Sequence, residues 1–285
     1  MAILRVALVQ YEARDDVADN LARASALARE AASGADLVVL PEYVQFRGSV
    51  EGFRASAAAL PGPTTEPFAA VARESGAWIL AGSHAETSGD PLRPYNTSPL
   101  LDPDGAVVAT YRKLHLFDVS VDDGPSDRES ARATPGDRAV VVAGGPAGAS
   151  LGLAICYDLR FPELFRGLAH AGAEVLTLPA VFTARTGRDH WEPLVRARAI
   201  ENGAWMLACG ASGAGGTGSI PAWGHSMIVD PWGRVVAEAG DGEEIIRAGL
   251  DLSLVAAARR QIPALANVRP DALPPVRAVE VVRGA

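Results

Sequence analysis

The chain has 285 residues, 48% of them apolar, with a mean hydropathy of +0.11 and a net charge of -8 from 26 basic and 34 acidic residues. A chain of this size buries enough surface to fold without stabilisation by disulfide bonds or metal ions. We expect one domain over residues 1–285. The acidic balance and the scattered arginines argue against nucleic acid as a partner. We expect neither a signal peptide nor a membrane-spanning segment.

Strand-like runs alternate with amphipathic helical patterns through the first half of the chain. The helix at 20–30 is predicted from apolar residues on one face and from Gly34 as its stop. The turn at 102–105 should join two strands as a hairpin. The expected strands are 3–10, 37–40, 78–82, 97–101 and 107–111, and the expected helices are 20–30 and about 67–75.

The second half repeats the alternation and then becomes strand-rich. We expect strands at 151–155, 175–178, 205–209, 226–230, 235–238 and 245–251, and helices at 163–170, 189–201 and 253–261. From about residue 263, prolines keep an extended C-terminal tail out of helix, and its apolar run at 276–282 needs covering, which another subunit could supply. The pattern predicts an α/β fold, best read as a four-layer α/β sandwich, with a doubly wound single sheet as the alternative.

Cys156 stands at the end of an apolar strand and just before the first turn of a helix, which contains Pro162. Such an elbow exposes a thiol beside backbone N–H groups that can hold an oxyanion. The alternative is a buried small hydrophobe, and Cys209 fits that alternative well. Two distant cysteines in apolar runs also argue against a disulfide framework or a zinc cluster and favour a reducing compartment, the cytoplasm.

Glu42 and Lys113 also follow strands, at 37–40 and 107–111. Each alone is most often a solvated loop or strand-end residue. Together with Cys156 they supply a base, a fixed positive charge and a nucleophile at the ends of three strands, which is the set of groups needed for hydrolysis through a thioester.

Three segments that contain these residues, 40–42, 111–118 and 155–163, resemble the signatures of the nitrilase superfamily. Further segments, 190–192, 196–202 and 223–226, resemble its Nit-type amidase branch, and within that branch the omega-amidases. The resemblance extends over almost the whole chain. It implies the four-layer αββα sandwich of that superfamily, usually assembled as a homodimer or a higher homo-oligomer.

The resemblance also implies roles for individual residues. The catalytic glutamate, lysine and cysteine fall on Glu42, Lys113 and Cys156, and the second glutamate of the family falls on Glu129. Lys113 and the backbone N–H of Tyr157 are the expected oxyanion donors. Nitrilases usually carry Trp and Glu after the cysteine, whereas this chain has Tyr157 and Asp158, so an amide is the expected substrate.

The expected substrate is the omega-amide of a dicarboxylic acid monoamide, with deaminated glutathione or an N-carbamoyl amine as alternatives. Arg160, one helical turn beyond Cys156, is the candidate for the free carboxylate of such a substrate, because an arginine grips a carboxylate in two places. The alternative for Arg160 is a structural ion pair with Asp158 or Glu163. Phe182 and Thr183 are expected to form another wall of the pocket.

The remaining signals do not support another class of function. The glycine run at 213–218 fits a dinucleotide-binding pattern, but it continues as a loop instead of a helix, so an oxidoreductase is not favoured. The five histidines form no metal pair at helical spacing, and we expect no metal and no cofactor. A non-catalytic interaction protein of the same fold remains the alternative from a different class.

Overall fold

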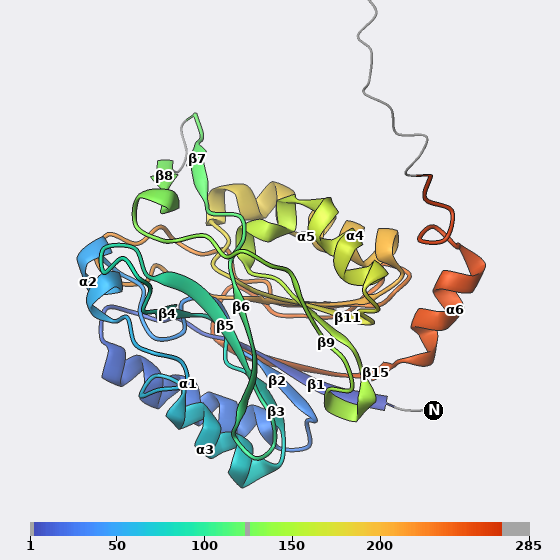
Figure 1. Cartoon of the computed structure of the whole chain (residues 1–285), viewed down its shortest axis with the longest axis horizontal. Helices are drawn as coiled ribbons and strands as arrows, with labels where there is room; N and C mark the ends of the chain where they lie inside the picture. Colours follow the sequence, from blue (N-terminus) through green and yellow to red (C-terminus); the bar gives the residue numbers. More distant parts are fainter. Residues whose placement is uncertain (1–2, 123–125, 270–285) are drawn as a thin grey trace, which may run out of the picture.

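The computed structural model describes residues 3–122 and 126–269. Their two large sheets pack face to face with helices on both outer sides, and a two-stranded sheet lies apart from them (Figure 1). Helices α1 (Val17–Ala32) and α3 (Glu66–Ser75) cover one sheet, and helices α4 (Pro162–His170) and α5 (Ala184–Asn202) cover the other. This arrangement confirms the predicted αββα sandwich. The single doubly wound sheet, left open from pattern alone, is wrong.

The first sheet has seven strands in the described part of the chain. They are β1 (Ile3–Gln10), β2 (Leu37–Val39), β3 (Trp78–Leu80), β4 (His84–Glu86), β5 (Tyr95–Leu101), β6 (Val107–Arg112) and β15 (Glu244–Asp251). Their order is β15-β1-β2-β3-β5-β4, with β6 beside β5. Because β1, β2 and β3 run parallel, the chain leaves β2 and β3 at the same edge of the sheet.

The second sheet has six strands among the described residues, in the order β14-β13-β12-β11-β10-β9. They are β9 (Val140–Val142), β10 (Leu151–Leu153), β11 (Val175–Ala180), β12 (Trp205–Gly210), β13 (Met227–Val229) and β14 (Val235–Glu238). Strands β10, β11 and β12 are parallel. Their carboxyl ends therefore form one edge, where open sheets place their functional groups.

Alternation along β1 shows why both faces of the first sheet are apolar. Leu4, Val6 and Leu8 are fully or almost fully buried in the core between the sheets, whereas Ala7 and Val9 are buried against the helices α1 and α3. A strand buried on both faces reads as a continuous apolar run, and that is how the sequence 3–10 appears.

Most differences from the predicted elements lie at their ends. Helix α1 begins at Val17 instead of residue 20 because Asp16 caps it, accepting from the N–H of Asp19. Helix α5 begins at Ala184 instead of residue 189. The prediction missed α2 (Val50–Ala55), β4, β9, the pair β7 (Asp118–Ser120) and β8 (Ser126–Arg128), and three short 3-10 turns.

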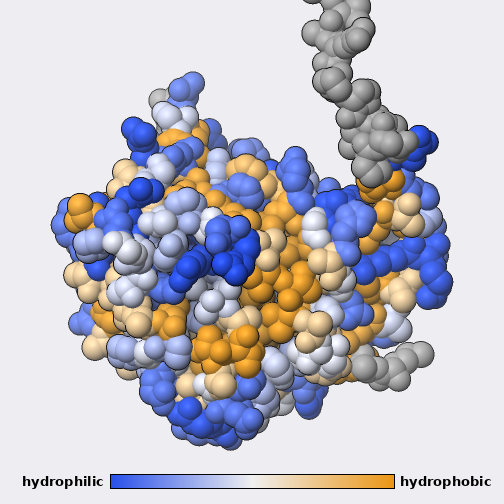
Figure 2. Space-filling model, viewed as in Figure 1, coloured by the Kyte–Doolittle hydropathy of each residue, from blue (hydrophilic) through white to orange (hydrophobic). Residues whose placement is uncertain are grey.

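Helix α6 (Ser253–Gln261) is present as predicted, and residues 263–269 after it form neither helix nor strand. The rest of the predicted tail, with its apolar run at 276–282, lies outside the described residues. Among the described helices, none has the length and apolar character that crossing a membrane requires. Figure 2 shows hydrophobic residues gathered where the edge strands β6 and β9 lie next to each other.

Gly82 holds the segment that follows β2 in place. Its φ is +63°, and a Cβ at this position would lie 2.1 Å from the carbonyl oxygen of Pro41. Gly76 also has a left-handed φ, +72°, but a Cβ there would meet nothing within 4 Å. The two glycines therefore share a backbone requirement and differ in the space around them.

We expect Gly76→Ala to lower the free energy of unfolding by about 1 kcal/mol, the cost of a left-handed alanine. Gly82→Ala should cost at least about 2–3 kcal/mol, because the added carbon also displaces the backbone that carries Glu42. Urea unfolding measures both values. Equal losses for the two variants would contradict the close packing of Gly82 against Pro41.

Candidate active site

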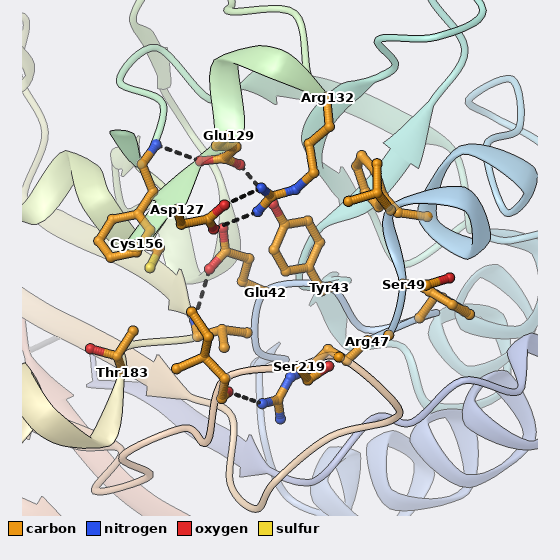
Figure 3. A pocket seen from close by; sticks show the side chains of 18 of the residues that line it. Glu42, Tyr43, Arg47, Ser49, Asp127, Glu129, Arg132, Cys156, Thr183 and Ser219 are labelled. Carbon is orange, nitrogen blue, oxygen red and sulfur yellow. Dashed lines mark hydrogen bonds and ion pairs between the residues drawn. The ribbon is translucent and has the colours of Figure 1, made fainter. Parts of the chain in front are cut away.

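The predicted catalytic residues come together at one end of the sandwich, where the two sheets meet (Figure 3). Glu42 follows β2, Lys113 follows β6, and Cys156 follows β10. Glu129 lies in a 3-10 turn, Glu129–Ala131, after β8. All four side chains are almost fully buried and line one cavity of about 420 Å³, which is large enough for a small molecule.

Lys113 is held between the two carboxylates. Its Nζ donates to Glu42 Oε1 and to Glu129 Oε2, each at 2.9 Å. Burial by itself lowers the pKa of the ammonium, but the charges of Glu129 and Glu42 outweigh burial, so the pKa lies well above its ordinary value. Lys113 is therefore a permanent cation. An ammonium has three hydrogens, and the third remains for a group in the cavity.

Glu129 is fully occupied by donors. Oε1 accepts from the Tyr43 hydroxyl at 2.6 Å and from Asn96 Nδ2 at 3.3 Å, and Oε2 accepts from Lys113 and from the N–H of Phe117 at 2.6 Å. Burial by itself raises the pKa of Glu129. The charge of Lys113 and these hydrogen bonds outweigh burial, so the pKa lies below its ordinary value. This carboxylate therefore stays ionised and orients Lys113.

Glu42 links the two sheets. Oε1 accepts from Lys113 and from Asn96 Nδ2 at 2.8 Å, and Oε2 accepts from the backbone N–H of Val181 at 2.7 Å. Val181 directly follows β11 of the second sheet, whereas Glu42 follows β2 of the first. A carboxylate offers about four lone-pair positions, so one position on Oε2 is left to take up a proton.

Cys156 occupies a strained backbone position. Its φ is +46°, in the left-handed region that a residue with a side chain rarely adopts. Burial and the neighbouring Glu42 carboxylate raise the pKa of its thiol well above the usual range. The resting sulfur is consequently protonated, and it needs a base in order to become a nucleophile.

The elbow after Cys156 is fixed by Asp158. Its Oδ2 accepts from the N–H of Ile155 at 2.9 Å and from the Tyr111 hydroxyl at 2.7 Å. Its Oδ1 contacts the N–H and the ring Nδ1 of His115 at 3.2 and 2.7 Å. The chain turns through a 3-10 helix, Cys156–Arg160, before α4 begins at Pro162. In the described part of the chain, the Tyr157 N–H donates no backbone hydrogen bond outside its own 3-10 turn.

The structure separates the predicted substrate-binding residues. Thr183 lines the main cavity, whereas Tyr157 and Phe182 line a small hollow on another side of Cys156, which Thr183 also reaches. Arg160 is not among the residues lining either space. Its guanidinium lies 5.1 Å from the centre of the Phe182 ring and 3.3 Å from His190 Nδ1. The alternative for Arg160, an ion pair with Asp158 or Glu163, is not formed among the described residues.

Several residues that line the cavity or hold its carboxylates were missed by the sequence reasoning. Asn96 and Tyr43 hold the two carboxylates, and Tyr43, like Cys156, has a left-handed φ, +55°. Arg132 lines the cavity in a two-point ion pair with Asp127, and Arg47 lines it from the opposite side (Figure 3). Asn96 stands directly before the predicted strand 97–101, next to the polar Thr97 and Ser98, so nothing in the sequence pattern distinguished it, and the same holds for the other residues.

Comparisons with known proteins agree with this geometry. The sequence profile described as carbon-nitrogen hydrolase matches residues 5–260. The chain is 39% identical over 272 residues to omega-amidase NIT2 of Mus musculus, covering 95% of this chain and 97% of that protein. It is 41% identical over 272 residues to the deaminated glutathione amidase of Homo sapiens, covering 93% and 82%.

A solved structure shows the same architecture. The crystal structure of Nit3 from Saccharomyces cerevisiae, described as a member of branch 10 of the nitrilase superfamily, superimposes with a TM-score of 0.81 at 32% identity and covers 92% of this chain and 95% of that chain. The profile match, the two relatives and the shared fold all agree with a site that contains a buried cysteine, a buried lysine and two buried glutamates. The chain therefore belongs to the carbon-nitrogen hydrolase family.

Proposed function

We propose that this enzyme hydrolyses the omega-amide of a dicarboxylic acid monoamide to the dicarboxylate and ammonia, through a thioester on Cys156. The observation that carries the proposal is the buried thiol of Cys156 next to Glu42, a carboxylate with one free lone-pair position that Lys113 and the Val181 N–H hold in place. The similarity to omega-amidase NIT2 of Mus musculus supports this choice of substrate class.

In the first half-reaction, the Cys156 proton passes to Glu42 as the sulfur forms a bond to the amide carbon. The oxygen that gains charge accepts hydrogen bonds from the third N–H of Lys113 and from the Tyr157 N–H. Glu42 then returns the proton to the nitrogen, the carbon–nitrogen bond breaks, and ammonia leaves. The thioester remains on the enzyme.

In the second half-reaction, Glu42 takes a proton from water as its oxygen attacks the thioester carbon, and the same oxyanion donors act again. The carbon–sulfur bond breaks and Glu42 returns the proton to the sulfur. The product forms as the carboxylic acid, and its remaining proton passes to the released ammonia or to solvent, which leaves a carboxylate. Glu129 touches no reacting atom in this scheme. It acts as a positioning residue for Lys113.

We also propose a cytoplasmic location, because both cysteines are free thiols in the structure. Assembly as a homodimer or higher homo-oligomer is proposed on the family resemblance. It is supported by exposed apolar side chains on α5 and around β14, namely Ile200, Trp232, Val235 and Val236.

The nucleophile assignment is tested by a pair of cysteine variants. Cys156→Ala should abolish turnover while the protein stays folded. Cys209→Ala should remain active, because Cys209 is fully buried on β12 and donates to the carbonyl oxygens of Val9 and Val39, away from the cavity. Intact-mass spectrometry during turnover should show an acyl adduct in the wild type and none on Cys156→Ala. An adduct on Cys209 would refute the assignment.

Glu42→Gln and Lys113→Ala should each slow turnover about a hundredfold or more, since one removes the proton carrier and the other an oxyanion donor. Their stabilities should differ. Glu42→Gln keeps the shape of the side chain, whereas Lys113→Ala leaves two buried carboxylates without their cation and should cost about 3–5 kcal/mol of unfolding free energy. Normal turnover by either variant contradicts its role, and unchanged stability of Lys113→Ala contradicts the buried network.

The substrate class is tested by ammonia release from a panel of amides and related compounds. We expect succinamate and alpha-ketoglutaramate to be hydrolysed with higher kcat/KM than the neutral butyramide, and nitriles to be poor substrates. Deaminated glutathione and N-carbamoyl amines serve as the competing substrates. A clear preference for either of these, or for butyramide, would overturn the proposed class.

A further inference from the structure

Arg47 is a buried cation in the main cavity that the proposed chemistry does not use. It lies in the segment between Glu42 and α2, and only 4% of the residue is exposed. Figure 3 shows its guanidinium on the side of the cavity opposite Glu129, with Glu42 between them. The guanidinium of Arg47 therefore faces the same cavity as the reacting groups but takes no part in the proposed chemistry.

The guanidinium is held by neutral acceptors only. Its Nη1 donates to the carbonyl oxygen of Ser212 at 2.8 Å, and its Nη2 donates to those of Ile220 at 3.1 Å and Gly213 at 3.5 Å. A guanidinium has five N–H groups, so the Nε–H and one Nη1 hydrogen remain. Among residues 3–122 and 126–269, no carboxylate forms an ion pair with Arg47.

Two carboxylates act on Arg47 through space, and both are already occupied. Glu12 pairs with Arg14 at 3.0 Å and accepts from the N–H of Gly215 at 2.9 Å. Glu42 is engaged by Lys113. The other arginine of the cavity, Arg132, is neutralised by Asp127. Arg47 is thus the cation of the cavity lining that lacks a bound counter-charge.

The glycine run at 213–218 is shaped around this arginine. A Cβ on Gly215 would lie 3.1 Å from Arg47 Cζ, and a Cβ on Gly216 would lie 2.6 Å from the carbonyl oxygen of Arg47. The N–H of Gly216 donates to that same oxygen at 3.0 Å. The glycine run at 213–218, which fits a dinucleotide-binding pattern, therefore packs around Arg47 and fixes the position of its guanidinium.

A buried charge without a partner is unfavourable, and here burial lowers the pKa of Arg47. An anion that enters the cavity removes this cost, because a carboxylate can accept hydrogen bonds from the N–H groups of the guanidinium that remain. We infer that Arg47 is the specificity-determining residue that binds the free carboxylate of the substrate, at the end of the molecule away from the amide. This inference rests on the proposed function and assigns its carboxylate subsite.

The test compares kcat/KM for succinamate and for butyramide, which has a methyl group where succinamate has its carboxylate. Arg47→Lys keeps the charge and changes the positions of the N–H donors, so it should reduce the succinamate value about tenfold, and Arg47→Gln should reduce it about a hundredfold. Both variants should leave the butyramide value nearly unchanged. Thermal denaturation establishes that each variant is folded, and Arg47→Lys carries the test if Arg47→Gln does not fold.

Arg160→Gln is the matched comparison, because it removes an arginine close to Phe182 but outside the cavity lining. We expect it to alter both substrates alike. A selective loss for succinamate in Arg160→Gln and not in Arg47→Gln assigns the carboxylate to Arg160 and overturns the inference. Equal losses for both substrates in the Arg47 variants show a structural role only, which also overturns it.

Binding of glutarate, measured by calorimetry, separates this inference from the proposed function. Glutarate carries a carboxylate but no amide, so its binding does not depend on turnover. If the wild type hydrolyses neither amide, or prefers butyramide, the proposed substrate class is wrong. Even then, weaker binding of glutarate to Arg47→Gln than to the wild type supports the carboxylate subsite. Equal glutarate affinity in the two proteins, or no binding to the wild type, overturns the subsite.

Discussion

The geometry of the site depends on one buried ammonium held between two buried carboxylates. Lys113 with Glu42 and Glu129 carries a net charge of one negative unit inside the protein. Such a group is stable only if hydrogen bonds from donors compensate most of the lost solvation of its charges. Asn96, Tyr43 and the N–H groups of Phe117 and Val181 supply those donors, and they come from strands and loops of both sheets.

This requirement explains the order of the surrounding structure. Because Glu42 accepts from Val181, the carboxyl ends of β2 and β11 must face each other across the sandwich. The apolar core between the sheets fixes their separation, so the packing of residues such as Leu8 and Leu153 sets the positions of the base and the nucleophile. The strained turns at Tyr43 and Cys156 then aim both side chains into the same cavity.

The four layers of the sandwich and three of the four buried site residues could be predicted from the sequence, because they follow from the local alternation of strand and helix patterns. Glu42, Lys113 and Cys156 stand directly after apolar strands, and parallel strands bring their ends together. Glu129 offered no such pattern, since it lies in a short 3-10 turn, and only the family resemblance pointed to it.

Pattern reasoning could not place side chains whose roles depend on distant partners. Arg160 looked well situated one turn after Cys156, but the 3-10 turn directs it toward His190 and Phe182. Arg47 appeared as one more loop residue, because the loop that encloses it lies 165 positions further along the chain at Ser212. Short elements such as α2 and β7 have too few residues for a periodic signal.

The raised pKa of Cys156 has a consequence for how this enzyme withstands oxidants. Peroxides and many electrophiles react with a thiolate and only slowly with a thiol. Since burial and the Glu42 carboxylate raise the pKa of the thiol, they disfavour the thiolate while no substrate is bound. The same environment that makes Cys156 depend on a base therefore slows its oxidation between turnovers.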